Sequence, residues 1–271
     1  MSRFRFIQVQ SSEEIQTITL NRPEKRNALS PELIDELTQV LDETATCDCG
    51  VVILTGAGSA FCAGLDMEHL ESINAHTIEQ HRRDSENMAR VLRSLYEFPK
   101  PIIAAVNGPA IAAGMGLATL CDFTYASPEA RFGFTEVRVG FVPAIMASFL
   151  SRQIGEKRTR ELLLSGRIMN ATEACRLGLI TRIVQPEELM ADAIAMARTL
   201  LQNSPQAMRA VKQLLAGHAA NLLDEELEDA IATNAMQRST EDFREGVSAF
   251  LEHRRPEWPS QQKMHLHDIH E

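Results

Sequence analysis

Apolar and polar positions alternate with period two near the start of the chain and then follow helical spacing. Residues 15–20 alternate in this way and end before Asn21-Arg22-Pro23, which predicts an extended strand running into a turn. A helix is expected next, because Ser30 can cap it and Pro31 suits its first position. Its apolar face would consist of Leu33, Ile34, Leu37, Val40 and Leu41.

Strand and helix patterns continue to alternate down to about residue 185. Short apolar runs at 51–55, 102–106 and 122–126 predict further strands, and no linker separates the units. The pattern therefore predicts an α/β core over residues 1–185.

Beyond this core the apolar residues keep helical spacing. Helices are expected over 187–201, 205–215, 222–236 and 242–253, so residues 186–255 form a predicted helical region. Residues 256–271 are expected to be a flexible tail. A helical region of this kind serves self-association or packs on its own core, and the pattern leaves both open.

Composition and charge narrow the class of protein. The chain has 271 residues, of which 44% are hydrophobic, which suits one large domain with a substantial core. A net charge of −10 argues against general binding of nucleic acid or an anionic membrane, so the expected partner is a small molecule. The first residues lack the continuous apolar stretch of a secretory signal, and we expect a cytoplasmic protein.

Other patterns argue against metal, nicotinamide and membrane sites. The five cysteines lack the paired spacing of a metal site and are expected to be reduced thiols, and the histidines at 265, 267 and 270 are more typical of a mobile tail. The glycine pattern from Gly56 resembles a dinucleotide fingerprint, but Phe61 occupies its last position. Residues 101–120 carry no charge, yet Asn107-Gly108-Pro109 breaks them into an expected buried strand and helix start.

Two glycine-containing turns each follow an apolar run. The first, residues 59–66, reads SAFCAGLD, and the second, residues 111–116, reads IAAGMG. Small residues let the backbone approach a ligand closely, and an N–H left free at such a turn can donate to an oxyanion. Two such donors on one oxygen would stabilise an enolate, whereas the plainer interpretation is a pair of ordinary strand-to-helix connections.

Several segments resemble the enoyl-CoA hydratase/isomerase (crotonase) superfamily in order and spacing. They are residues 18–29, 61–66, 107–108, 121–122 and 132–136, with further similarity at 173–180 and 246–250. The resemblance implies a crotonase-like spiral of repeated ββα units with a helical C-terminal trimerisation region. It also implies an acyl-CoA thioester substrate without a separate cofactor or metal, and a homotrimer or dimer of trimers.

Matching positions imply the roles of individual residues. The backbone N–H groups of Ala63 and Ala113 would hold the thioester oxygen, where each well-aimed donor is worth about 3 to 4 kcal/mol in the transition state. The position that offers a basic residue to the CoA phosphates holds His253, with Arg254 and Arg255 beside it. The expected contacts to substrate and CoA come from Arg26, Ala28, Asp66, Gly114 and Gly116.

The resemblance also shows a departure in the catalytic side chains. Family hydratases carry two glutamates, and here the first position holds Gly116 whereas the second holds Glu136. Glu136 follows an apolar segment, where desolvation would raise its pKa toward a range useful for proton transfer; a surface glutamate is the alternative.

A single carboxylate favours double-bond isomerisation, because it can take a proton from the α-carbon of a 3-enoyl thioester and return it to the γ-carbon. Hydration of a 2-enoyl thioester is the alternative, with another acid or base. The candidates for that role are Glu68, His69, Glu71, His81 and Asp84. A non-catalytic acyl-CoA-binding protein is the remaining hypothesis.

Overall fold

The computed structural model describes residues 3–73 and 76–262. Its main sheet has the strand order β1-β2-β3-β4-β6-β9, and a small second sheet has the order β5-β7-β8. The strands of the main sheet are β1 (Ile7–Ser12), β2 (Ile15–Leu20), β3 (Val51–Gly56), β4 (Ile102–Val106), β6 (Phe123–Ala126) and β9 (Arg182–Ile183). The second sheet consists of β5 (Ala110–Ile111), β7 (Arg131–Gly133) and β8 (Met169–Asn170).

The predicted helix after Ser30 and the four predicted C-terminal helices are present, together with further helices. The helices are α1 (Pro31–Thr46), α2 (Met67–Ile73), α3 (Ile78–Tyr96), α4 (Ala113–Thr119), α5 (Ala144–Ile154), α6 (Glu156–Ser165), α7 (Ala171–Leu177), α8 (Leu189–Leu201), α9 (Pro205–Gly217), α10 (Ala220–Gln237) and α11 (Glu241–Leu251). The short 3₁₀ helices η1 (Pro23–Lys25) and η2 (Glu136–Val139) complete the described elements. The expected strands at 15–20, 51–55, 102–106 and 122–126 are confirmed.

Local sequence signals set the helix boundaries. Leu33 N donates to Ser30 Oγ over 3.3 Å with Pro31 in the first turn, and the same arrangement of a serine cap before proline begins α9 at Ser204. The helix α3 begins with a capping box, in which Gln80 N donates to Thr77 Oγ1 and Thr77 N donates to Gln80 Oε1.

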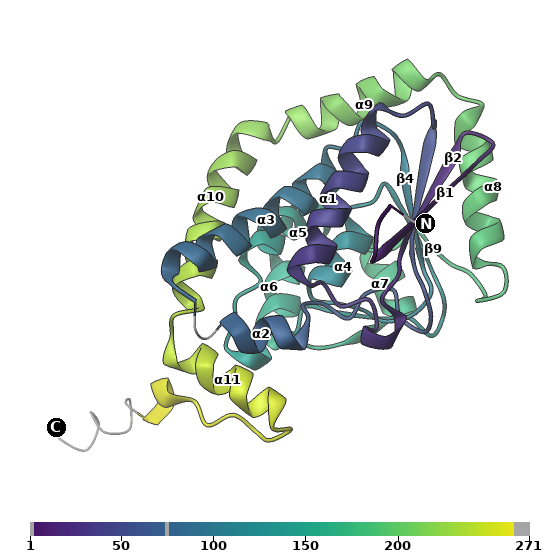
Figure 1. Cartoon of the computed structure of the whole chain (residues 1–271). Coiled ribbons are helices and arrows are strands. Elements are labelled where there is room, and N and C mark those ends of the chain that lie inside the picture. Colours follow the sequence, from purple (N-terminus) through teal and green to yellow (C-terminus); the bar gives the residue numbers. More distant parts are fainter. Residues whose placement is uncertain (1–2, 74–75, 263–271) are drawn as a thin grey trace.

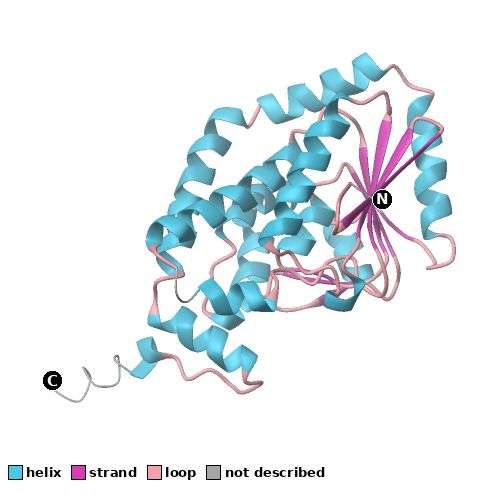
Figure 2. Cartoon of the chain, in the orientation of Figure 1, coloured by secondary structure: helices cyan, strands magenta, loops and turns pink. Residues whose placement is uncertain are grey.

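Helices cover both faces of the main sheet. From β2 to β9 the pairing is parallel, and every residue of β3 is buried, which explains its continuous apolar run. Figure 1 shows α8 against one face and α1, α4 and α5 on the other, and Figure 2 shows the strands fanning between these layers.

Among the C-terminal helices, α8 and α10 pack on the core, whereas α9 exposes apolar side chains. The helix α8 closes the second core against Val51 and Tyr125, and α10 packs along α3 and α5. The helix α9 bridges them and leaves a row of apolar side chains exposed. That row consists of Val211, Leu214 and Leu215, continued by Leu222 at the start of α10, each at least 56% exposed.

The predicted tail is described only in part. Residues 256–262 lie along α11, where Ser260 N donates to Asp242 Oδ1 and Glu257 N donates to Glu245 Oε1. Residues 263–271, including His265, His267 and His270, lie outside the described residues. No helix in the described ranges is long and apolar enough to cross a membrane, and residues 102–119 run through β4, β5 and α4.

Candidate active site

The two glycine turns predicted from the sequence lie against each other. Cys62 N donates to Pro109 O over 3.1 Å, and Ile111 N donates to Cys62 O over 3.0 Å, so the chain segments run side by side. A Cβ added at Gly114 would lie 2.3 Å from Cys62 O, and one added at Gly64 would lie 3.1 Å from Ile111 O. The glycines are therefore required for the close approach of the two turns.

The structure corrects one of the two expected oxyanion donors. Ala63 N donates to Arg26 O over 3.0 Å, so this N–H is already paired. The N–H groups of Leu65 and Ala113 have no acceptor within the described residues, and both residues line the same cavity. Leu65, two residues after Ala63, therefore replaces it as the free donor on the first turn, while Ala113 remains the free donor on the second.

The backbone before Ala113 adopts a conformation that favours glycine. Ala112 has φ 53° and ψ −126°, and its N–H donates to Gly133 O over 2.7 Å. This strained residue precedes α4 and directs the first helical N–H, that of Ala113, away from the helix. Strain of this kind is typical of functional turns, where surrounding hydrogen bonds maintain it.

Glu136 lies at the first position of η2, directly after the small sheet. The residue as a whole is half-buried, but its Oε2 atom is buried and has no hydrogen-bond partner in the described part of the protein. Burial raises the pKa of the Glu136 carboxyl from 4.5 to about 7. The expected apolar environment of Glu136 is thus present, and at neutral pH the group can both accept and return a proton.

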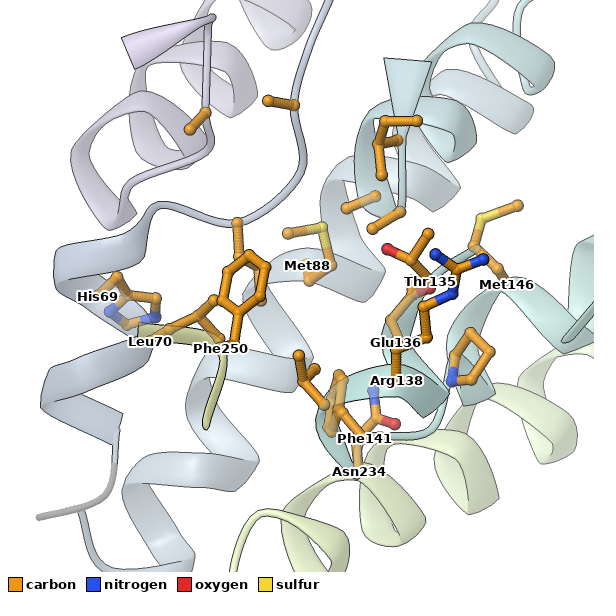
Figure 3. Close-up of a pocket in the computed structure, with 18 of the residues that line it drawn as sticks. His69, Leu70, Met88, Thr135, Glu136, Arg138, Phe141, Met146, Asn234 and Phe250 are labelled. Carbon is orange, nitrogen blue, oxygen red and sulfur yellow. The ribbon is translucent and has the colours of Figure 1, made fainter. Parts of the chain in front are cut away.

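One cavity of about 780 Å³ contains Glu136 together with Leu65 and Ala113. Figure 3 shows Glu136 and Thr135 on one side of this cavity and His69, Leu70 and Phe250 on the other, with Met88 between them. Apolar side chains line most of its wall, so a water molecule or carbonyl oxygen bound near Glu136 would be largely shielded from solvent.

Two of the residues expected to contact CoA line the cavity, namely Arg26 and Ala28. Three others do not. The Asp66 carboxylate is buried and paired with Arg22 over 2.9 Å, with a hydrogen bond from Glu68 N. Gly114 is packed on Cys62, and Gly116 is packed on Met146. Neither Gly114 nor Gly116 lines the cavity, because a neighbouring side chain or backbone atom covers each of them. Their expected contact with the substrate is therefore replaced by a packing role.

The position of the missing family glutamate is filled by apolar side chains. A Cβ at Gly116 would lie 2.7 Å from Met146 Sδ and 3.2 Å from Leu92 Cδ2. Met146 and Leu92 themselves line the cavity. Met146 cannot be identified from the sequence, because nothing in the pattern of α5 distinguishes it from an ordinary core residue.

The alternative acids and bases fall into two groups. Glu68 and Glu71 are exposed, with Glu68 paired to Lys25 over 2.7 Å, and His81 is buried behind the cavity wall. Only His69 and Asp84 line the cavity, and His69 Nε2 lies 3.5 Å from Asp84 Oδ2.

The basic residues near the C-terminus are less available to bind the CoA phosphates than expected. Arg254 lines the cavity, but its guanidinium is paired with Glu245 over 2.5 Å and with Glu252 over 2.6 Å. These carboxylates raise the Arg254 pKa. His253 and Arg255 are exposed and do not belong to the cavity lining.

No group of three or more histidine, cysteine or acidic side chains capable of holding a metal occurs within residues 3–73 and 76–262. The five cysteines are all free thiols in the structure.

Comparisons with known proteins agree with this arrangement. The family model for enoyl-CoA hydratase/isomerase matches residues 10–261. A Thermus thermophilus protein named "Putative enoyl-CoA hydratase" is 43% identical over 89% of this chain and 96% of its own length. A 2,3-dehydroadipyl-CoA hydratase from Escherichia coli is 33% identical over 92% and 97% of the two chains.

Solved structures share the fold. An enoyl-CoA hydratase/isomerase from Pseudoalteromonas atlantica superposes with a TM-score of 0.83 at 30% identity, covering 94% of this chain and all of that one. An enoyl-CoA hydratase from Bacillus halodurans gives 0.85 at 26% identity, covering 90% of this chain and all of that chain. The mixed α/β architecture is thus the crotonase fold, and the chain belongs to the enoyl-CoA hydratase/isomerase family.

Proposed function

We propose that this protein adds water to the double bond of a 2-enoyl-CoA thioester. The names of its relatives support hydration over the isomerisation that the single glutamate favoured. They include the Thermus thermophilus protein and a short-chain-enoyl-CoA hydratase from Clostridium acetobutylicum, which is 35% identical over 90% of this chain. Hydration of a 2-enoyl thioester is the alternative that the sequence left open beside isomerisation.

The observation that carries the proposal is the state of Glu136. Among the described residues its Oε2 is buried without a partner and two backbone donors in the same cavity are unpaired, and the Glu136 pKa is about 7. A buried oxygen without a partner is unfavourable in the empty protein, so a ligand that supplies a hydrogen bond is expected to bind there. In the proposed reaction that ligand is the attacking water.

One carboxylate is sufficient for a stepwise addition. Glu136 removes a proton from water while the water oxygen bonds to the β-carbon, and the electrons of the double bond move onto the thioester oxygen. The protonated Glu136 then returns the proton to the α-carbon, and the thioester carbonyl re-forms. The water molecule is consumed completely, and the glutamate ends in its starting state.

Leu65 and Ala113 stabilise the enolate between these steps. Their N–H groups donate to the thioester oxygen, where negative charge develops, and the apolar wall keeps bulk water from weakening those hydrogen bonds. This is the arrangement inferred for Ala63 and Ala113, with Leu65 in place of Ala63 because the N–H of Ala63 is paired with Arg26 O.

The CoA portion is proposed to lie by the segment before α1. Lys25, Arg26 and Ala28 line that part of the cavity, and a polyanionic nucleotide would be attracted to the two cations. The proposal gives the phosphates no contact with His253.

We also propose that the protein self-associates through α9. Its exposed row of Val211, Leu214 and Leu215 would be an unfavourable apolar surface on a monomer. A trimer or dimer of trimers, which the family resemblance implies, would cover this surface.

The function is tested with purified protein, 2-enoyl-CoA and 3-enoyl-CoA thioesters of four to ten carbons, and mass spectrometry of the products. The proposal predicts a mass increase of one water from the 2-enoyl substrates. Movement of the double bond in the 3-enoyl substrates without hydration would instead support the isomerase hypothesis. Binding of acyl-CoA without turnover of either set would identify a non-catalytic binding protein.

A further inference from the structure

A second polar group lies in the cavity, apart from Glu136. It consists of His69 from α2, Asp84 from α3, and Asn234 and Arg238 at the end of α10, which we call the distal subsite. Arg238 Nη1 lies 3.3 Å from Asp84 Oδ2, and His69 Nε2 lies 3.5 Å from the same oxygen. Three helices thus bring charged and polar side chains together in one part of a cavity wall that is mostly apolar.

The distal subsite has hydrogen-bonding capacity that the protein itself does not use. Asn234 is 4% exposed, and its Oδ1 has no partner within the described residues. The ion pairs of Asp84 all involve Oδ2, so Oδ1 remains available. A buried polar atom without a partner destabilises the folded chain, and its presence in a cavity wall points to a ligand that completes the hydrogen bond.

The charges of Arg238 and Asp84 oppose each other within the subsite, while the Arg238 guanidinium packs on the Phe141 ring at 5.2 Å. Burial lowers the pKa of His69, which favours its neutral imidazole. A carboxylate bound here would add an unbalanced charge to a buried site, whereas a neutral group would not.

A ligand group that suits these partners must both donate and accept hydrogen bonds. Asn234 Oδ1 and Asp84 Oδ1 accept, and the Arg238 guanidinium donates. A hydroxyl group does both and is neutral. A methyl group would leave the acceptors unpaired, and a keto oxygen could not donate to them.

The subsite can be reached by the acyl chain. Lys25, which lines the cavity on the segment before α1, is paired over 2.7 Å with Glu68, the neighbour of His69, so the cations adjoin the His69 end of the subsite. Figure 3 shows His69 across the cavity from Glu136, and Asn234 below Glu136 beside Phe141. A thioester with its reacting carbons at Glu136 can therefore extend its chain toward these side chains.

We propose that the distal subsite binds a hydroxyl group on the acyl chain, so that the preferred substrate is a hydroxyl-bearing 2-enoyl-CoA. This inference rests on the proposed function, because it takes the acyl chain of an enoyl thioester to occupy the cavity.

The test compares matched six-carbon 2-enoyl-CoA substrates whose last carbon is a methyl, a hydroxymethyl or a carboxylate. The expected result is a kcat/KM at least about tenfold higher for the hydroxymethyl chain than for the other two, since unpaired acceptors penalise the methyl chain and charge penalises the carboxylate. A preference for the methyl chain or for the carboxylate overturns the proposal.

The variant Asn234→Leu keeps the number and branching of the side-chain heavy atoms and removes its hydrogen-bonding atoms. We expect it to lower the ratio of hydroxymethyl to methyl kcat/KM by about tenfold. The control Met88→Leu, an apolar change in the same wall, is expected to leave that ratio within about twofold. An Asn234→Leu ratio equal to that of the control contradicts the role of Asn234.

Binding of saturated acyl-CoA ligands separates this inference from the proposed function. Titration calorimetry with hexanoyl-CoA and 6-hydroxyhexanoyl-CoA needs no turnover and remains interpretable if Asn234→Leu does not fold. Tighter binding of the hydroxylated ligand by wild-type protein supports the subsite even if hydration fails. Equal binding, or tighter binding of hexanoyl-CoA, refutes it even if hydration succeeds.

Discussion

The sulfur of Met146 occupies the space that a side chain at Gly116 would enter, with 2.7 Å between Sδ and an added Cβ. A contact this short requires Met146 to move. The side chain that fits at position 116 is therefore coupled to the position of Met146 on α5. Glu136 lines the cavity together with the acidic side chains of Glu24 and Asp84.

The coupling predicts the outcome of restoring the second glutamate. Gly116→Glu alone should destabilise the protein by about 1 to 3 kcal/mol through overpacking and should not raise hydration. Gly116→Glu with Met146→Ala should recover stability and hydrate 2-enoyl-CoA faster than Met146→Ala alone, because the carboxylate then reaches the cavity. Thermal unfolding and initial rates measure both effects. A fast, stable single variant would show that Met146 moves aside easily.

Glu136 predicts a pH dependence of the reaction. As the base it must be ionised, so kcat/KM should rise tenfold per pH unit below about pH 7 and level off above it. Glu136→Gln should lower turnover by about 10³-fold while saturated acyl-CoA affinity stays within a few-fold, because the amide cannot accept the proton. Stopped-flow or steady-state rates from pH 5 to 9 measure the profile. A flat profile, or a near-normal rate in the variant, would transfer the role to another group.

The same carboxyl predicts a stability change with the opposite trend. The pKa of Glu136 is about 7 in the folded protein, above the ordinary glutamate value of 4.5. The contribution of this carboxyl to the free energy of unfolding is therefore fully present below pH 4.5 and is lost as the pH rises through 7. Above pH 7 the ionised carboxylate costs about 3 kcal/mol. Glu136→Gln should therefore be more stable than wild type at pH 8, by up to that amount, and the difference should shrink toward pH 5. Urea unfolding at several pH values checks this, and a constant difference would contradict the raised pKa.

The backbone donor of Ala113 can be removed without a bulky side chain. Proline is tolerated at the first position of a helix, so Ala113→Pro should fold yet lose the N–H and lower kcat/KM by about 10²- to 10³-fold. The matched control is Ala112→Gly, which keeps the donor and relieves the positive φ of Ala112; its stability should be unchanged or raised by about 1 kcal/mol. Full activity in a folded Ala113→Pro protein would place the second donor elsewhere.

The exposed row on α9 predicts a concentration-dependent assembly. Leu214→Asp with Leu215→Asp should convert the oligomer to monomer in light scattering coupled to size exclusion, because two charges would be buried in the contact. Exposed charged substitutions on α6, such as Lys157→Asp, serve as a control and should leave the mass unchanged. A wild-type protein that is already monomeric would show that the row has another role.

Much of the molecule was predictable because the relevant signals are local. Period-two and helical spacing gave the strands and helices, the serine–proline pairs marked the starts of α1 and α9, and the apolar segment before Glu136 predicted its raised pKa. The two glycine turns were also visible, since a close backbone approach demands small residues in any context. These sequence signals depend on neighbours within a few residues, although the burial that raises the Glu136 pKa is completed by the rest of the fold.

The assignment of individual site atoms was decided by tertiary contacts. Whether Ala63 or Leu65 offers a free N–H depends on the carbonyl of Arg26, and the Asp66 carboxylate pairs with Arg22 instead of facing the cavity. No local pattern encodes which partner captures a given hydrogen-bonding group, because the competing groups come from distant segments.

The distal subsite shows the same distinction most clearly. Asp84 and Arg238 are 154 positions apart, and the sequence pointed to Asp84 as a candidate acid or base but gave no sign of a role for Arg238. The fold of α3 against α10 brings them into one partly buried ion pair in the wall of the cavity. The sequence by itself determined the elements, the family resemblance and the main carboxylate, whereas the packing of helices decided which polar groups remain unpaired, because burial and hydrogen-bond competition are properties of the assembled chain.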